Sequence, residues 1–208
     1  MNWTRACIAA VVGAAATCGA VALSARQDAA RARTPPTPAI REALAELNAR
    51  FTVRGHPVHP GLIERFDRWE SDSAEPAVVS VDALAAAGSN EYSDDSVKRE
   101  DDGQVTIMKE GGRGYFGYKW LGSVAPGMHV VRAFANGGGS GIFETLFVLR
   151  ASAGTGQGPD GPYPQLLISV VRVFPLGDRD EASVTVRPNT IIISKSRYRD
   201  KAVTLQIK

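Results

Sequence analysis

The sequence predicts a mostly β protein, an antiparallel β-sandwich of jelly-roll-like or Greek-key type with two short N-terminal helices. After residue 76 it contains about eight or nine short apolar, β-branched or aromatic segments separated by turn residues, a pattern typical of sandwiches and barrels. The same region shows no alternation of strands and helices, which argues against a parallel α/β sheet.

The first 24 residues have the pattern of a secretory signal peptide. Arg5 precedes an uncharged, alanine-rich run over residues 6–23, and small residues occupy the −3 and −1 positions before Ala25. Two alternatives stay open, because the run is just long enough for an uncleaved membrane anchor and because Cys18 could be lipidated. We expect an exported protein, periplasmic or extracellular, that meets a membrane only if the leader is uncleaved or lipidated.

Cysteine content and charge exclude several classes of protein. Cys7 and Cys18 are the two cysteines of the chain, and both lie in the leader. A cleaved chain would therefore hold itself together by burial, without disulfides, thiol nucleophiles or cysteine metal ligands. The formal net charge of +2 is too small to indicate nucleic acid as a partner.

Residues 25–38 are polar and proline-rich, which predicts a flexible linker. Residues 39–208 are then expected to form a single β-rich domain that includes both helices. Thr37 is a good N-cap and Pro38 suits the first helical position, so the apolar spacing predicts a helix from about Pro38 to Arg50. A second short helix is expected from Pro60 to about Trp69.

The remaining segments are assigned as strands, loops and turns. The expected strands span residues 77–81, 104–109, 115–121, 128–135, 142–149, 165–174, 183–187, 190–194 and 202–207. Residues 165–174 are apolar enough to be covered on both faces, and residues 175–179 should turn the chain. Residues 83–102 and the glycine- and proline-rich residues 151–164 are predicted to be long surface loops.

The most conspicuous motif is the glycine-rich run of residues 136–141. A strand rather than a helix follows it, and Ile142 interrupts the spacing of a nucleophile elbow, so neither a phosphate loop nor a hydrolase motif fits. A hairpin turn that needs positive φ angles remains. We therefore expect Gly139→Val to harm folding more than any single histidine-to-alanine change.

Three polar residues on the central strands, His129, Arg132 and Glu144, are the candidates for catalytic residues. Polar groups in the middle of a fold can mark a site, because burial shifts their pKa values. They can equally face water, and no local motif supports a Ser-His-Asp triad.

Aromatic residues supply the candidates for ligand binding. These are Tyr92, Tyr115, Tyr118 and Trp120, which with Phe116 could form a sugar-stacking platform on an exposed sheet face. The alternative is that the same residues form part of the core and its rim, where tyrosine buries its ring and hydrates its hydroxyl.

Two clusters have residue types that can bind metal ions. His56 and His59 have a spacing that metal sites use, but they lie in a proline-broken turn. The acidic residues around 91–102 could supply oxygens to calcium, yet the EF-hand pattern is absent. These are Glu91, Asp94, Asp95, Glu100, Asp101 and Asp102. We expect no metal and no cofactor.

Six short segments carry one further signal. They are PVHP at 57–60, WESD at 69–72, SNEY at 89–92, YFGYKW at 115–120, GGGSGIF at 137–143 and PLGDR at 175–179. Together they resemble a group of uncharacterised exported bacterial proteins over roughly residues 56–207. The resemblance implies export, but it implies no activity and no functional residue.

These observations lead to two expectations for function. The first is an exported envelope binding or structural module, whose partner would be a carbohydrate or an envelope protein. The alternative is a periplasmic hydrolase or lyase acting on a polysaccharide or a similar polymer. Convergence of His129 and Glu144 with Tyr92 or Asp94 in one pocket would favour the enzyme.

Overall fold

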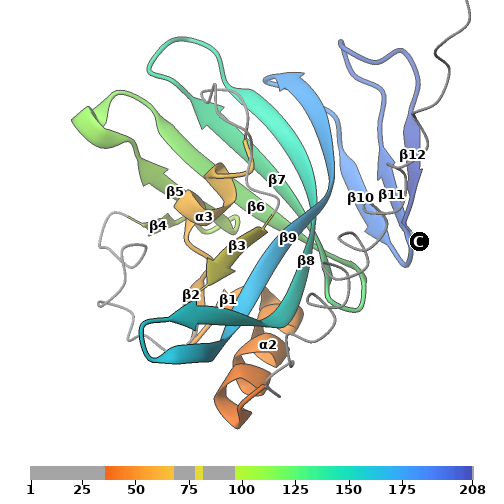
Figure 1. The fold of residues 1–208 in the computed structure, drawn as a ribbon. Helices are drawn as coiled ribbons and strands as arrows, with labels where there is room; N and C mark the ends of the chain where they lie inside the picture. The colour runs from red at the N-terminus through yellow and green to blue at the C-terminus, as the bar shows by residue number, and fades with distance from the viewer. Residues whose placement is uncertain (1–35, 68–77, 82–96, 208) are drawn as a thin grey trace, which may run out of the picture. The chain divides into compact units, whose positions relative to one another are not determined.

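A computed structural model describes residues 36–67, 78–81 and 97–207 (Figure 1). These residues belong to one compact unit, Thr34–Lys208. The fold is mostly β and its sheets are antiparallel. The leader, most of the linker, Trp69, Tyr92 and Asp94 lie outside the described residues.

Both α-helices of the described residues precede the main sheet along the chain. The helical elements are α2 (Pro38–Arg50), α3 (Pro60–Glu64) and the 3-10 turn η1 (Glu110–Gly112). The strands are β1 (Thr52–Val53), β2 (His56–Pro57), β3 (Val78–Val81), β4 (Lys98–Arg99), β5 (Gln104–Met108), β6 (Tyr115–Ala125), β7 (Met128–Asn136), β8 (Phe143–Gly158), β9 (Gly161–Asp178), β10 (Val184–Arg187), β11 (Thr190–Ile193) and β12 (Val203–Gln206).

Helix α2 has the predicted bounds. The Thr37 hydroxyl accepts a hydrogen bond from the N–H of Ile40 at 3.3 Å, and Pro38 occupies the first turn, where no N–H partner is needed. The helix ends because Phe51 adopts a left-handed conformation with φ of 55°. Helix α3 is shorter than expected and ends at Glu64 rather than near Trp69.

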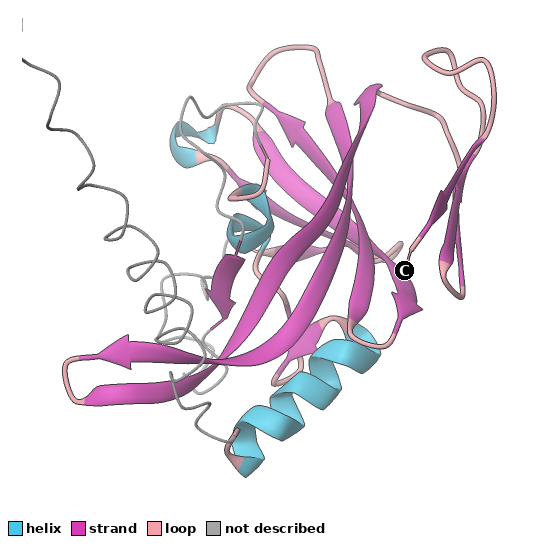
Figure 2. Ribbon diagram, turned by 45° about the vertical axis from the view of Figure 1, so that its right-hand side comes forward, coloured by secondary structure: helices cyan, strands magenta, loops and turns pink. Residues whose placement is uncertain are grey.

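The main sheet has seven strands in the order β3-β9-β8-β7-β6-β5-β4. From β4 to β9 each strand pairs with its neighbour in sequence, so the sheet is a meander to which β3 is added beside β9. The sheet curls into a half-barrel (Figure 2). Strands β10, β11 and β12 form a second, three-stranded sheet, and β1 pairs with β2. A sandwich or jelly roll is not confirmed.

Two apolar cores lie on opposite faces of the main sheet. The inner face, which carries Phe116, Val131 and Phe147, packs with the buried sides of α2 and α3 in the first core. We call the opposite face of the main sheet the outer face. Over part of β6 to β9, outer-face residues such as Val130 and Leu146 pack with residues of the three-stranded sheet in the second core. The rest of the outer face, over β4 to β8, is where the candidate site lies.

The predicted loop of residues 151–164 is instead a strand hairpin. Strand β8 continues to Gly158 and β9 begins at Gly161, and the two remain paired throughout. We call residues 151–165 the arm; Figure 2 shows it projecting from the sheet. Glycine weakens a strand, but here a Cβ on Gly156 would lie 2.5 Å from the Tyr163 ring, and one on Gly154 would lie 2.3 Å from Leu167. These side chains cover the glycines and supply the missing contacts.

Strand β9 also differs from two other expectations. It is not covered on both faces, because Val171 and Val173 are 43% and 37% exposed. Residues 175–179 do not turn the chain as predicted, because β9 continues to Asp178. The segment is extended because Thr145, Glu144 and Phe143 of β8 pair with it.

The glycine-rich run joins β7 to β8, but the backbone conformation at Gly139 does not require a glycine. An added Cβ on Gly139 would meet nothing, and its φ is not positive. The constrained glycines are Gly138, with φ of +91°, and Gly114, with φ of +102° and an ideal Cβ position only 2.2 Å from the carbonyl oxygen of Asn136. The physical basis for ranking Gly139→Val above every histidine change is therefore wrong.

Candidate functional site

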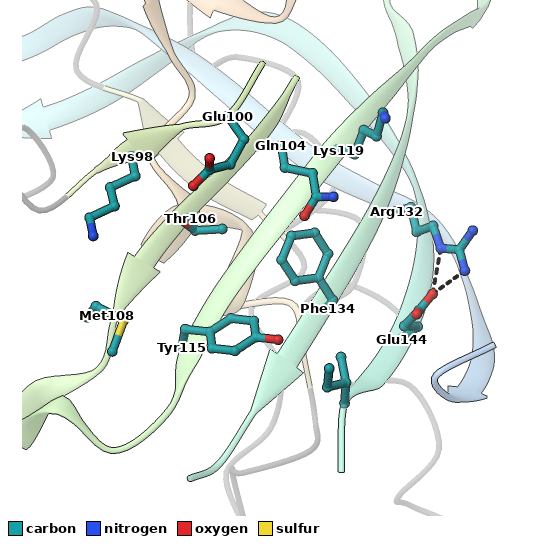
Figure 3. A pocket seen from close by; sticks show the side chains of 11 residues that line it. Lys98, Glu100, Gln104, Thr106, Met108, Tyr115, Lys119, Arg132, Phe134 and Glu144 are labelled. Carbon is teal, nitrogen blue, oxygen red and sulfur yellow. Dashed lines mark hydrogen bonds and ion pairs between the residues drawn. The ribbon is translucent and has the colours of Figure 1, made fainter. Parts of the chain in front are cut away.

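An open hollow of about 620 Å³ lies on the outer face over β4 to β8 (Figure 3). Strand register builds it, because Gln104, Lys119 and Arg132 are consecutive cross-strand neighbours. The next row contains Thr106, Gly117, Phe134 and Glu144. The lining residues are Lys98, Glu100, Gln104, Thr106, Met108, Tyr115, Lys119, Arg132, Phe134, Ile142 and Glu144.

An aromatic pair lies in the hollow. Phe134 is paired with Gly117 across β6 and β7, and a Cβ on Gly117 would lie only 2.5 Å from the Phe134 ring. The ring therefore lies over the glycine, against the sheet. Tyr115 meets it edge to face, with ring centroids 6.2 Å apart and planes inclined by 67°. The amide of Gln104 lies beside the Phe134 ring (Figure 3), and the methyl group of Thr106 lies over Gly117 next to that ring.

The charges around the hollow balance. Three cationic side chains line it, Lys98, Lys119 and Arg132, against two carboxylates, Glu100 and Glu144. Asp102, just outside, accepts hydrogen bonds from the Gln104 amide at 2.7 Å and from the Lys119 ammonium at 3.2 Å. With Asp102 counted, three positive charges face three negative ones, so the site offers no net charge to a polyanion.

Arg132 and Glu144 form one wall of the hollow. The Arg132 Nε donates to Glu144 Oε2 at 2.5 Å, and its second terminal nitrogen also pairs with that oxygen. The guanidinium further donates to the carbonyl oxygens of Ala182, at 2.9 Å, and Asp180. Burial raises the pKa of Glu144, and the contact with Arg132 opposes that effect. The pair thus ties β7 and β8 to the segment that leads into the three-stranded sheet.

His129 is not part of this group. It lies on the inner face, is fully buried, and its ring centroid is 5.1 Å from that of Phe51. Its Nε2 lies 3.2 Å from Asn48 Oδ1 and its Nδ1 3.3 Å from the Ser123 hydroxyl, which suits a neutral ring that donates once and accepts once. Burial lowers the pKa of His129 to about 4. Grouping it with Arg132 and Glu144 as a catalytic set was wrong.

The aromatic candidates also separate by face. Tyr115 lies in the hollow, whereas Tyr118 is buried in the first core and donates its hydroxyl hydrogen to the carbonyl of Val58 at 2.5 Å. Trp120 packs against the same core, its ring stacked on Phe51 with centroids 6.5 Å apart. A platform that combines Tyr115 with Tyr118 and Trp120 is therefore not formed.

Phe134, Gln104 and Thr106 were not among the residues predicted to form a site. The signal for Phe134 was present, since it lies two residues after Arg132 and strand residues two apart share a face. Gln104 and Thr106 follow the same rule on β5 and flank Val105, which is buried on the inner face.

Residues of the two clusters that could have bound metal ions make structural contacts instead. His59 caps α3, its Nδ1 accepting from the N–H of Gly61 at 3.0 Å, while His56 lies exposed on β2. Asp102 holds the turn before β5 through the N–H of Gln104. Within the part of the chain that the structure describes, no three histidine, cysteine or acidic residues group as metal ligands. Glu91, Asp94 and Asp95 lie outside that part.

Comparisons with family models, with curated proteins and with solved structures found no match. The resemblance to exported bacterial proteins therefore stays a prediction. Among the described residues, the helices are all too short or too polar to cross a membrane.

Proposed function

We propose that this protein is an exported binding module of the cell envelope whose outer-face hollow binds a neutral carbohydrate chain. The observation that carries the proposal is the Tyr115–Phe134 pair on an open sheet face, in a hollow that the polar side chains of Gln104 and Thr106 also line. A sugar ring has an apolar C–H face and a rim of hydroxyls, and aromatic rings with a few convergent polar groups match both.

Charge balance selects the neutral class of carbohydrate. The three cationic side chains are offset by Glu100, Glu144 and the adjacent Asp102, and Arg132 is bound to Glu144 and to backbone carbonyls. An acidic polymer would need unpaired cations along the hollow, as would a nucleic acid. A hydroxyl-rich neutral ligand needs only hydrogen-bond donors and acceptors.

The contacts favour this module over the alternative, a periplasmic hydrolase or lyase. A general acid or base must reach the reacting atoms, yet His129 lies on the opposite face of the sheet and Glu144 is held by Arg132. Export rests on the leader sequence and on the resemblance to exported bacterial proteins.

The proposal extends to the three-stranded sheet and how it stacks on the main sheet. We infer that β10 to β12 stack on the outer face through the second core and thereby leave only the β4 to β8 part of that face open to ligands. Stacked sheets that share a core are the essence of a sandwich.

Affinity electrophoresis of the full chain in gels containing neutral or acidic polysaccharides tests the proposal. We expect retardation in at least one neutral polysaccharide, and about tenfold weaker binding for Tyr115→Ala and for Phe134→Ala, equivalent to about 1.4 kcal/mol. Tyr163→Ala is the matched control, because it removes an exposed tyrosine of the arm, outside the hollow.

Three outcomes would count against the proposal. Lack of retardation in every neutral polysaccharide would reject the ligand class, and equal weakening by Tyr163→Ala would reject the site. Release of reducing ends or of unsaturated sugars from the polymer would support the hydrolase or the lyase instead.

A further inference from the structure

One edge of the arm has no neighbouring strand among the described residues. Strand β7 pairs with β8 only as far as Met128 opposite Arg150, and the N–H of Ala151 donates to the carbonyl of Gly127 at 2.9 Å. From Ser152 to Gly158, β9 is the one described strand with which β8 pairs. A two-stranded ribbon is marginally stable in water, and its free edges offer unpaired N–H and C=O groups to another strand.

The register shows which backbone groups point outward. The hairpin reverses through two residues, with Gly158 opposite Gly161, so this is a hydrogen-bonded pair. Alternate residues then direct their backbone groups away from the partner strand. These outward positions are Ala153, Thr155 and Gln157 on β8, and Pro162 and Pro164 on β9.

The two edges of the arm are therefore unequal. Proline has no N–H, so Pro162 and Pro164 block strand addition along β9. Prolines and charged side chains usually protect a free strand edge against pairing. Residues 152–157 of β8 contain neither. Among the described residues, the β8 edge of the arm is thus open to another strand, whereas the β9 edge is closed by its prolines.

The open edge is complementary to itself. If a second copy pairs antiparallel about Thr155, that residue faces its counterpart, and Ala153 faces Gln157 of the copy. Three residues on each edge then exchange about six hydrogen bonds. Gly154 and Gly156 fall opposite each other at the pairs where backbones approach most closely, and neither residue has a side chain of its own to hold the two strands apart. Opposed threonines form a favourable cross-strand pair.

We propose that two copies of this protein form a closed two-fold dimer by antiparallel pairing of residues 152–157 of β8. The one charged residue of the arm is Asp160, at its tip, so the two edges meet without charge repulsion. Each arm pairs once because its β9 edge is blocked, and the assembly closes instead of growing. The contact is short, so the dimer is weak and depends on concentration. It is independent of the carbohydrate site, which does not include the arm.

Sedimentation velocity of the full chain, from submicromolar to hundred-micromolar concentration, tests the dimer. We expect a monomer–dimer equilibrium that Thr155→Pro and Thr155→Lys each weaken at least tenfold. The proline removes an outward N–H without removing a β8–β9 hydrogen bond, and the lysine places two like charges opposite each other. Asp160→Lys is the matched control and should dimerise like the parent, because it changes charge in the arm but not at the edge. Circular dichroism checks that every variant folds.

Amide hydrogen exchange locates the contact. The N–H groups of Thr155 and Gln157 should be protected at high concentration and exchange faster on dilution. A monomer at every concentration would overturn the proposal, as would a dimer that survives both Thr155 changes. Protection that does not change on dilution would also overturn it, because another segment of the chain or a different partner would then cover the edge.

Discussion

The two faces of strands β6 and β7 have opposite roles although their residues alternate along the same chain. Phe116, Tyr118 and Val131 point into the first core and are at most 1% exposed. Tyr115 and Phe134 point to the outer face and line the hollow. The inner-face residues of these strands thus hold the fold together. On the outer face, Val130 is buried in the second core, while Tyr115 and Phe134 are available to a ligand.

His129 and Arg132 show how sharp this division is. They lie three residues apart on β7, yet one is a neutral, buried ring beside Phe51 and the other is an ion-paired wall of the hollow. Proximity in sequence therefore predicts little about shared chemistry on a strand. Whether two residues of a strand are an even or an odd number of positions apart is a better guide, because residues an even number apart lie on the same face.

The largest expected effect contrasts a phenylalanine on each face. Phe147→Ala, on the inner face and fully buried, should lower the free energy of unfolding by about 3–5 kcal/mol. Phe134→Ala, half-buried on the outer face, should lower it by only about 1 kcal/mol while weakening carbohydrate binding. Urea unfolding followed by circular dichroism measures both. Equal losses of stability would mean that the outer face contributes to folding as much as the inner face does.

The next effect is a pH dependence that belongs to the inner face. The pKa of His129 is about 4 in the folded protein and 6.5 in a model peptide. Between these values the unfolded chain binds a proton that the folded chain excludes, so stability falls as the pH decreases from 6.5 to 4, by up to about 3 kcal/mol. Above pH 6.5 this contribution is constant.

His129→Gln should flatten that part of the stability profile, measured by urea unfolding at a series of pH values. The matched control is His56→Gln, which removes an exposed histidine and should leave the slope unchanged. A slope that persists in His129→Gln would assign the pH dependence to other groups.

The smallest expected effect compares two glycines near the hollow. Gly114→Ala forces a side chain into a positive-φ position and against the Asn136 carbonyl, which should destabilise the protein by on the order of 1–3 kcal/mol. Gly139→Ala meets open space and should leave the melting temperature nearly unchanged. Thermal unfolding measures both variants, and a larger loss for Gly139→Ala would show that the loop is constrained at its tip.

Much of the fold could be predicted because local chemistry fixed it. The Thr37 cap and Pro38 set the start of α2, and alternating apolar residues located most strands. The arm was missed because its glycines and prolines usually break strands. Here Tyr163 and Leu167 cover the glycines from the facing strand, and cross-strand neighbours cannot be known before the register is known.

The site was predicted only in part for a similar reason. Aromatics occur on both faces of β6, so composition alone could not separate Tyr115 from Tyr118 and Trp120. Which of these aromatics can bind a ligand depends on which face of β6 packs against α2 and α3, and this is determined by tertiary structure. The role of Gly117 could not be predicted for the same reason. Its pairing with Phe134 places an aromatic ring over the glycine, and that pairing is known only from the fold.

The position of β3 beside β9 has a consequence for how the chain folds. Strands β4 to β9 form successive hairpins, but the contact between Ser80 and Gln165 joins residues 85 positions apart and so closes a long loop. Strand β3 is therefore expected to join late. Until it does, Leu166 and Ile168 lie on an unprotected strand within an apolar, β-prone run, the kind of segment that aggregates. A chain interrupted before β3 docks would be most vulnerable at this run.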